Sequence, residues 1–326
     1  MNVGCIAAAE PVLKLRRKAL LSALGALAVT SALGYVLAGH RSQFAAALHS
    51  APLALLAAAA LLQIVALLAR TEAWFICVGA AGGTAPRRLL FRAAGVGYLA
   101  SVLNGSVGMA TRIASLRRAA PQSTPRVPAL LAAEVPIITV EVALAAIFSF
   151  TLIGPLGAPW WAPAIAVLAM AAVVVGLRRL CEKRRKGLWA GLAVLRNKGR
   201  GRMIAFTLLA VCAQIARNWL MLHAIGVNVS VFDAMALLIA MFTLGQLPVG
   251  PSIGPAAAVL ILGAHGIAAT AAAGVLLAVT GMSGSLCYAA WAIIDRTIAG
   301  RLDRKPEVAP PVTVTPVAVA VAVRSG

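Results

Sequence analysis

The stretch from Ala129 to Ile153, ALLAAEVPIITVEVALAAIFSFTLI, decides the fold class. Its only ionisable side chains are those of Glu134 and Glu141. About 20 consecutive apolar residues are enough for a helix to cross the hydrocarbon core of a bilayer. The stretch is therefore predicted to be a transmembrane helix. Because charge inside a membrane is costly, its two carboxylates are candidate functional groups.

Similar apolar runs recur along the chain, and its composition agrees with them. Hydrophobic residues make up 61% of the 326 residues and charged residues only 12%, with a mean hydropathy of +0.93. A soluble enzyme or a DNA-binding domain is far less apolar. We therefore predict an all-α integral membrane protein with about six full transmembrane helices. The other five predicted spans are 19–39, 52–69 with an extension toward Val78, 160–177, 203–225 and 268–294.

The run at 19–39 has a signal peptide as its alternative interpretation, since four basic residues precede it. The apolar core of a signal peptide is usually 7–15 residues long. The greater length here favours an uncleaved first helix.

Two more apolar regions do not have the pattern of plain spans. Residues 93–110 are rich in glycine and contain Asn104, and residues 234–265 are interrupted by Pro248, Pro251 and Pro255. Proline removes a backbone donor and clashes with the preceding helical turn. Non-helical backbone at membrane depth is tolerated only where it is buried in protein or lines a cavity. Both regions are predicted to be broken, re-entrant segments.

The formal charge of +20 has two competing explanations, contact with nucleic acid or a bias of basic residues toward cytoplasmic loops. If the N-terminus is cytoplasmic and both broken segments return to the side they entered from, 27 of the 29 Lys and Arg residues lie on the cytoplasmic side. Only Arg41 then lies outside, and Arg217 lies within a span. The positive-inside rule therefore predicts cytoplasmic N- and C-termini, and no nucleic-acid partner is needed.

This layout also predicts how the chain is organised. A cytoplasmic N-terminus (1–18) is followed by a membrane domain (19–305) and a disordered tail (306–326) rich in Pro, Val and Ala. The membrane domain divides into halves 19–153 and 160–305, whose breaks near Ser106 and Pro251 lie at similar distances along the sequence from the start of each half and in opposite orientation. Such a pattern is typical of an inverted repeat with a transport site at the broken segments. A chance match of two kinked helices is the alternative.

Polar residues at the breaks are candidates for binding a lipid headgroup, because an irregular segment presents free backbone N–H groups. This predicted headgroup site comprises Asn104, Ser106, Arg112, Pro251 and Gly254, together with the intramembrane Arg217.

The intramembrane charges form a second group. Glu134 and Glu141 lie two helical turns apart and so share a face. A pair between Glu141 and Arg217 is expected, either to hold a lipid phosphate in competition with the carboxylate or as a structural ion pair. Arg70, Glu72 and Trp74, at the predicted cytoplasmic end of the second span, are expected to be an interfacial anchor, with a headgroup site as the alternative.

The five cysteines and four histidines are scattered without metal-ligand spacing, so no metal and no cofactor is predicted. No paired nucleophile and base is visible, and the protein is not expected to be an enzyme.

The order of these features resembles the lysylphosphatidylglycerol synthase transmembrane-region family, membrane proteins with a flippase-like domain. The resemblance rests on Arg70 to Trp74, on Gly97-Tyr98 through Asn104 to Arg112, and on the turn from Pro248 to Gly254. It covers roughly residues 20–296.

The sequence departs from the family's pattern in two places. The Pro that follows the Asn in the family's first motif and the Gly-Glu that precedes the Arg are missing here. The Glu that ends its second motif is also missing, since Ala256 follows the turn. The resemblance implies lipid handling in a bacterial inner membrane without lipid synthesis.

We therefore expect an inner-membrane protein that binds or translocates an anionic lipid or lipid-linked molecule. A proton-coupled transporter of a small solute, using Glu134 or Glu141, is one alternative. A scaffold that transports nothing is another. The oligomeric state is left open.

Overall fold

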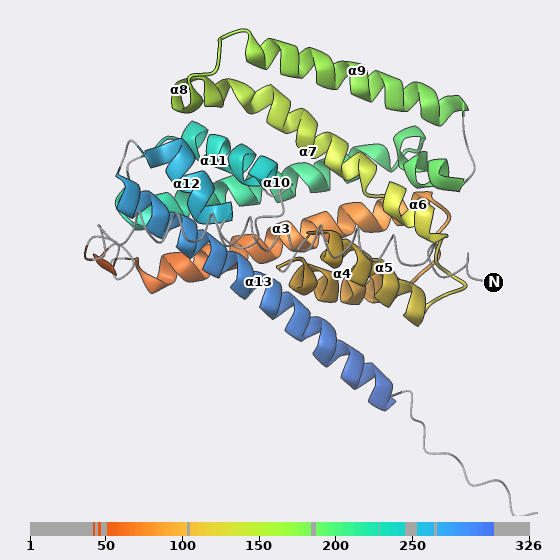
Figure 1. Ribbon diagram of the computed structural model, residues 1–326. Helices are drawn as coiled ribbons and strands as arrows, with labels where there is room; N and C mark the ends of the chain where they lie inside the picture. The colour runs from red at the N-terminus through yellow and green to blue at the C-terminus, as the bar shows by residue number, and fades with distance from the viewer. Residues whose placement is uncertain are drawn as a thin grey trace, which may run out of the picture.

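The structure, a computed structural model, describes residues 42, 45–46, 51–102, 105–183, 187–227, 229–244, 253–263 and 266–302. These residues form helices and connecting segments, and no strand occurs among them. Figure 1 shows the helices lying roughly alongside one another. Their bounds are α3 Leu53–Ala80, α4 Arg87–Ser101, α5 Gly105–Ala119, α6 Val127–Ala132, α7 Val135–Ile147, η1 Phe148–Leu152, α8 Ile153–Leu156, α9 Ala162–Lys183, η2 Gly187–Arg196, α10 Arg200–Ala224, α11 Val231–Leu244, α12 Ile253–Leu262 and α13 Ile267–Leu302.

Five segments of the described chain are long and apolar enough to cross a membrane. They are Leu53–Ala80, Val127–Leu156, Ala162–Lys183, Arg200–Ala224 and Ala269–Ala299. Each coincides with a predicted span, so the prediction of a long apolar helical segment is confirmed at these five positions. The predicted first span at 19–39, the N-terminal segment and the tail lie outside the described residues.

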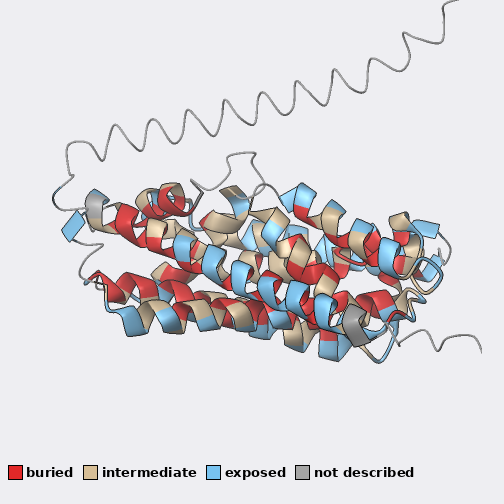
Figure 2. Cartoon of the chain, turned by 90° about the horizontal axis from the view of Figure 1, so that it is seen from below, coloured by how far each residue is buried: buried red, intermediate tan, exposed pale blue. Residues whose placement is uncertain are grey.

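Exposed positions run along the helices and are not confined to the loops (Figure 2). On α9 they include large apolar side chains such as Leu168 and Val173. An apolar outer surface of this kind suits the interior of a membrane, where apolar side chains meet lipid tails rather than water.

Helices α3 and α10 pack along each other at the centre of the molecule (Figure 1). Ala66 and Ala69 of α3 meet Ala210 and Ala213 of α10 in a buried cluster. Small side chains let two helix backbones approach closely, which is how helices gain packing energy in lipid. Helices α3 and α10 both contribute side chains to the candidate site described below.

Helices α4 and α5 form an antiparallel hairpin beside one end of α3 (Figure 1). They touch through glycines, since a Cβ on Gly108 would lie 2.8 Å from the carbonyl oxygen of Gly97. Helix α5 thus returns alongside α4, as predicted for the region 93–110. Residues 103–104 lie outside the described residues.

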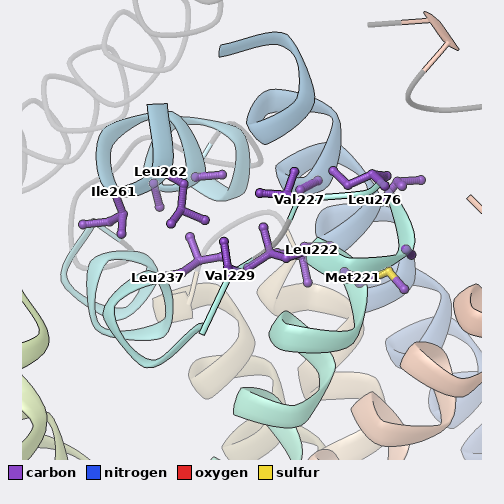
Figure 3. Close-up of a cluster of buried hydrophobic side chains, with 14 of the residues drawn as sticks. Met221, Leu222, Val227, Val229, Leu237, Ile261, Leu262 and Leu276 are labelled. Atoms are coloured by element: carbon purple, nitrogen blue, oxygen red, sulfur yellow. The ribbon is translucent and has the colours of Figure 1, made fainter. Parts of the chain in front are cut away.

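Helices α11 and α12 lie beside the opposite end of α3 (Figure 1). Their apolar side chains meet those of α10 and α13 in a buried cluster that includes Leu222, Leu237, Leu262 and Leu276 (Figure 3). The Pro-rich residues 245–252 between them lie outside the described residues. The described part of the second predicted broken segment therefore forms two short helices that pack against each other.

The quoted stretch 129–153 is broken, although its composition predicts a plain span. Helix α6 ends at Ala132 and α7 begins at Val135, with Pro136 in the first turn of α7. Proline has no N–H to bond the carbonyl four residues earlier, so the helix is interrupted there. Glu134 lies in this break.

Helix α13 contacts both hairpins and α3. Its Gly274 touches Pro255 of α12, its Gly284 faces Gln63 of α3, and Gly95 of α4 fits against its Tyr288 and Ala292. Small residues at each crossing allow one long helix to join the two hairpins.

Candidate functional site

Arg112 of α5 is buried between a carboxylate and an aromatic ring. It forms an ion pair with Glu134, and its guanidinium lies 4.1 Å from the centre of the Trp74 ring of α3. Arg112 is 6% exposed, Glu134 3% and Trp74 0%. The ion pair neutralises both charges, and the ring adds a cation–π contact. Arg112 is therefore held within the protein by Glu134 and Trp74, although its Nε has no hydrogen-bond partner, and it does not line the cavity described below.

Arg70 of α3 forms an ion pair with Glu141 of α7. Arg70 lies ten residues before the end of α3, about 15 Å along a helix that rises 1.5 Å per residue. The helix therefore extends beyond the predicted end of the second span, with Arg70 in its interior rather than at its end. The second oxygen of Glu141, Oε2, is buried without a hydrogen-bond partner.

The burial of Trp74 and Glu72 does not fit the interfacial anchor predicted for Arg70, Glu72 and Trp74. A belt tryptophan presents its ring to lipid headgroups, whereas the Trp74 ring is wholly buried against Arg112. Glu72 is also buried, and it pairs with Arg87 of α4 at 2.9 Å. Burial of these residues reflects the packing of the α4–α5 hairpin against α3, which sequence periodicity does not reveal.

Arg217 of α10 is the exception among the buried charges. It is 6% exposed and donates to the amide oxygen of Gln63 and, over 3.4 Å, to that of Asn218. No carboxylate of the described residues lies within ion-pair distance of it, and its Nε has no hydrogen-bond partner. The expected pair with Glu141 is not present, because Glu141 pairs with Arg70 instead. Arg217 thus carries an uncompensated positive charge inside the protein.

A cavity of about 270 Å³ opens beside these groups. Its polar lining comes from α3, α7 and α10, namely Gln63, Arg70, Glu141, Gln214 and Arg217. Its other wall is apolar and comes largely from α11. That wall includes Met235, Leu238, Ile239, Met241 and Phe242. One cavity therefore joins two arginines and one carboxylate to a surface suited to hydrocarbon.

A separate ionic cluster ties α4 to α13. The Arg88 Nε donates to both oxygens of Asp295 at 2.9 Å, and Arg92 also pairs with Asp295. Arg88 is largely exposed, so this cluster lies at the molecular surface rather than in the cavity.

Of the other predicted headgroup residues, the described ones, Ser106, Arg112 and Gly254, do not line the cavity. Asn104 and Pro251 lie outside the described residues. Ser106 is exposed on α5. Gly254 is buried against α13, where a Cβ would lie 2.8 Å from the carbonyl oxygen of Gly274. Of the predicted site residues, the cavity thus brings together Arg217, Glu141 and Arg70.

Sequence reasoning missed Gln63 and Gln214. Each is a polar side chain in an otherwise apolar span, and each shares a helix face with an arginine of the cavity. Gln63 lies seven residues before Arg70, and Gln214 lies three before Arg217. That spacing is the signal from which they could have been identified.

No group of three or more His, Cys, Asp or Glu side chains in the described part of the chain is placed to hold a metal ion. No known protein family, curated protein or solved structure matches the chain.

Proposed function

We propose that this protein binds an anionic lipid or lipid-linked molecule and moves it across a bacterial inner membrane. The observation that carries the proposal is the uncompensated charge of Arg217 in a cavity with one polar and one apolar wall. A buried charge without a partner costs several kcal/mol, so its presence favours a ligand that completes it. The anionic headgroup lies between Arg217 and Arg70, and the hydrocarbon chains lie along the α11 wall.

The cavity volume sets how much of the ligand enters. Sites that enclose a whole drug-sized molecule measure roughly 300–1,000 Å³. A cavity of about 270 Å³ holds a headgroup, and a complete lipid does not fit inside it. The acyl chains therefore stay in the surrounding bilayer while the headgroup is carried.

The arrangement of the hairpins supports alternating access as the mechanism. The α4–α5 and α11–α12 hairpins lie beside opposite ends of α3 (Figure 1), as an inverted repeat of two re-entrant segments requires. The central helices α3 and α10 are then corresponding elements of the two halves. The position that corresponds to the cavity in the other half lies between α3, α4 and α13, where Tyr98 and Tyr288 pack against Thr71. In this mechanism the headgroup crosses the membrane when the cavity closes and the region around Thr71, Tyr98 and Tyr288 opens.

The orientation follows from the basic residues. Helices α4, α5 and η2 and the end of α9, which carry most of the described Lys and Arg, lie toward one end of the molecule (Figure 1). The positive-inside rule makes that end cytoplasmic. Resemblance to the lysylphosphatidylglycerol synthase transmembrane-region family is part of the same proposal.

The test compares Arg217→Gln with the wild-type protein in binding and translocation of phosphatidylglycerol. Arg178→Gln is the matched control, because Arg178 is exposed and lies outside the cavity. We expect at least a tenfold loss of affinity and a loss of translocation in proteoliposomes for Arg217→Gln only. Unchanged binding and translocation in Arg217→Gln refute the proposal.

The presence of Glu141 in the cavity favours a second candidate, a proton-coupled transporter of a small anionic solute. Glycerophosphoglycerol, which has the same headgroup without acyl chains, separates the two candidates. A lipid site binds it at least tenfold more weakly than phosphatidylglycerol, because the α11 wall then has no hydrocarbon to contact. Equal affinity for the two compounds supports the small-solute transporter.

A further inference from the structure

The net charge of the ionised groups in the cavity affects which anionic ligand can bind there. Arg70 and Arg217 contribute two positive charges, and Glu141 contributes one negative charge. Arginine stays protonated in proteins. Gln63 and Gln214, the other polar residues of the lining, are neutral. The cavity therefore carries a net charge of +1.

The neighbouring elements do not alter this balance. Glu134, the nearest other carboxylate on the segment that carries Glu141, is paired with Arg112. Among the described residues, α11, η1 and the lining positions of α10 other than Arg217 contribute no ionisable group to the cavity. A ligand that enters thus meets one uncompensated positive charge and one internal ion pair.

We propose that the cavity selects a singly charged phosphodiester headgroup over a doubly charged phosphomonoester, and that Glu141 sets this selectivity. A phosphodiester neutralises Arg217 while the Arg70–Glu141 pair stays intact. A phosphomonoester dianion leaves one excess negative charge beside the Glu141 carboxylate. Like charges in a poorly solvated site repel strongly, since Coulomb energy grows as the local dielectric constant falls.

This inference rests on the proposed function, because it assumes an anionic lipid in the cavity. The probes are phosphatidylglycerol, a phosphodiester, and phosphatidic acid, a phosphomonoester, both with six-carbon acyl chains. Binding of each is measured to the purified full-length protein in mild detergent between pH 6 and pH 9. The charge of the phosphodiester does not change in this range, whereas the phosphomonoester gains its second charge as the pH rises.

For the wild-type protein we expect phosphatidylglycerol to bind with an affinity that does not depend on pH. Phosphatidic acid is expected to bind more weakly as the pH rises, and at least tenfold more weakly than phosphatidylglycerol at pH 8.5. Similar affinities for the two lipids at pH 8.5 overturn the inference. If neither lipid binds in a way that depends on Arg217, the proposed function itself fails, which is a different result.

A series of variants changes the net charge one unit at a time. Glu141→Gln raises it to +2 and is expected to reverse the preference, so that phosphatidic acid binds more tightly than phosphatidylglycerol at pH 8.5. Arg70→Gln lowers it to zero and is expected to weaken binding of both lipids at least tenfold. The double variant Glu141→Gln, Arg70→Gln restores +1 and is expected to restore the preference of the wild-type protein.

The double variant also addresses folding, because it leaves neither Arg70 nor Glu141 unpaired. Glu182→Gln is the matched control for replacement of a carboxylate, since Glu182 is exposed and outside the cavity. It is expected to leave both affinities unchanged. A double variant that folds but prefers phosphatidic acid shows that net charge does not set the selectivity, and the inference is then wrong.

Discussion

At the scale of single residues, Arg112 and Arg217 make an informative pair. Both are 6% exposed, but only Arg112 has a carboxylate partner, Glu134. Removing one partner of a buried ion pair destabilises the protein, because the other charge is then left uncompensated. A buried arginine without such a partner is itself the uncompensated charge. Neutralising the partner of Arg112 is therefore expected to lower the stability of the protein, whereas replacing Arg217 by an apolar residue is expected to leave it unchanged or raise it.

The first prediction concerns Glu134→Gln, which removes the partner of Arg112. We expect the free energy of unfolding to fall by about 3–5 kcal/mol, the usual cost of breaking a buried pair. The control is Glu182→Gln, whose exposed pair with Arg178 at 3.4 Å is expected to contribute less than about 1 kcal/mol. Unfolding in mixed detergent micelles measures both. Equal losses in the two variants contradict the prediction.

The second prediction concerns Arg217→Met, which replaces the unpaired charge by an apolar side chain of similar length. The protein is expected to be as stable as the wild type or more stable, by up to about 4 kcal/mol, while lipid binding is lost. Arg112→Met is the comparison, and it is expected to destabilise because Glu134 is left unpaired. Melting temperatures in detergent distinguish them. A clearly lower melting temperature for Arg217→Met identifies Arg217 as a structural residue instead.

At the scale of the elements, close helix contacts decide how the hairpins fold back. Gly97 and Gly108 bring α4 and α5 together, and Gly254 and Gly274 bring α12 against α13. Because lipid tails are as apolar as the helix surfaces, burial of apolar area adds little to helix association in a membrane. Backbone approach at small residues therefore matters more than it does in a soluble bundle.

The third prediction concerns Gly108→Ala. The added Cβ would lie 2.8 Å from the Gly97 carbonyl oxygen and 2.8 Å from the Ser101 Cα, so the two helices must separate. We expect a loss of about 1–3 kcal/mol, typical of overpacking. Gly176→Ala in α9 is the control, since no atom lies within 4 Å of its added Cβ, and it is expected to be neutral or stabilising. A Gly108→Ala protein as stable as the control shows that α4 and α5 are not in close contact.

At the scale of the whole molecule, the arrangement of the helices predicts on which side of the membrane the connecting segments lie. The α4–α5 hairpin returns the chain to the end from which it came, so the segment 120–126 lies on the same side as the end of α3. The segment 157–161 lies at the other end of the long helix pair α6–α7 (Figure 1).

The fourth prediction concerns these two segments in intact cells. In a cysteine-free background, Ala158→Cys is expected to react with an impermeant maleimide added outside, whereas Gln122→Cys is expected to react only after the membrane is permeabilised. Labelling of both in permeabilised cells shows that each thiol is accessible. Reaction of Gln122→Cys from outside contradicts the re-entrant interpretation of residues 93–110.

Much of this architecture could be predicted from the sequence because membrane insertion depends on the length and composition of local segments. The five described spans were predicted because an apolar run of about 20 residues has few other stable solutions. Residues 93–110 were predicted to turn back because their glycines and Asn104 do not fit a plain span and because a full crossing would place the basic residues of 111–128 outside. The break at Glu134 was missed, although Pro136 marks it, because the surrounding run is otherwise uniformly apolar.

The amino-acid sequence was enough to predict long apolar helices and to identify the few charged residues within them. Which of these charges neutralise one another depends on the tertiary structure. Arg70 takes Glu141, Arg112 takes Glu134, and Arg217 is left with amide partners. The physical reason is that pairing depends on which faces of α3, α5, α7 and α10 meet. That is set by helix packing over 22 to 154 residues of sequence separation, which local composition does not encode.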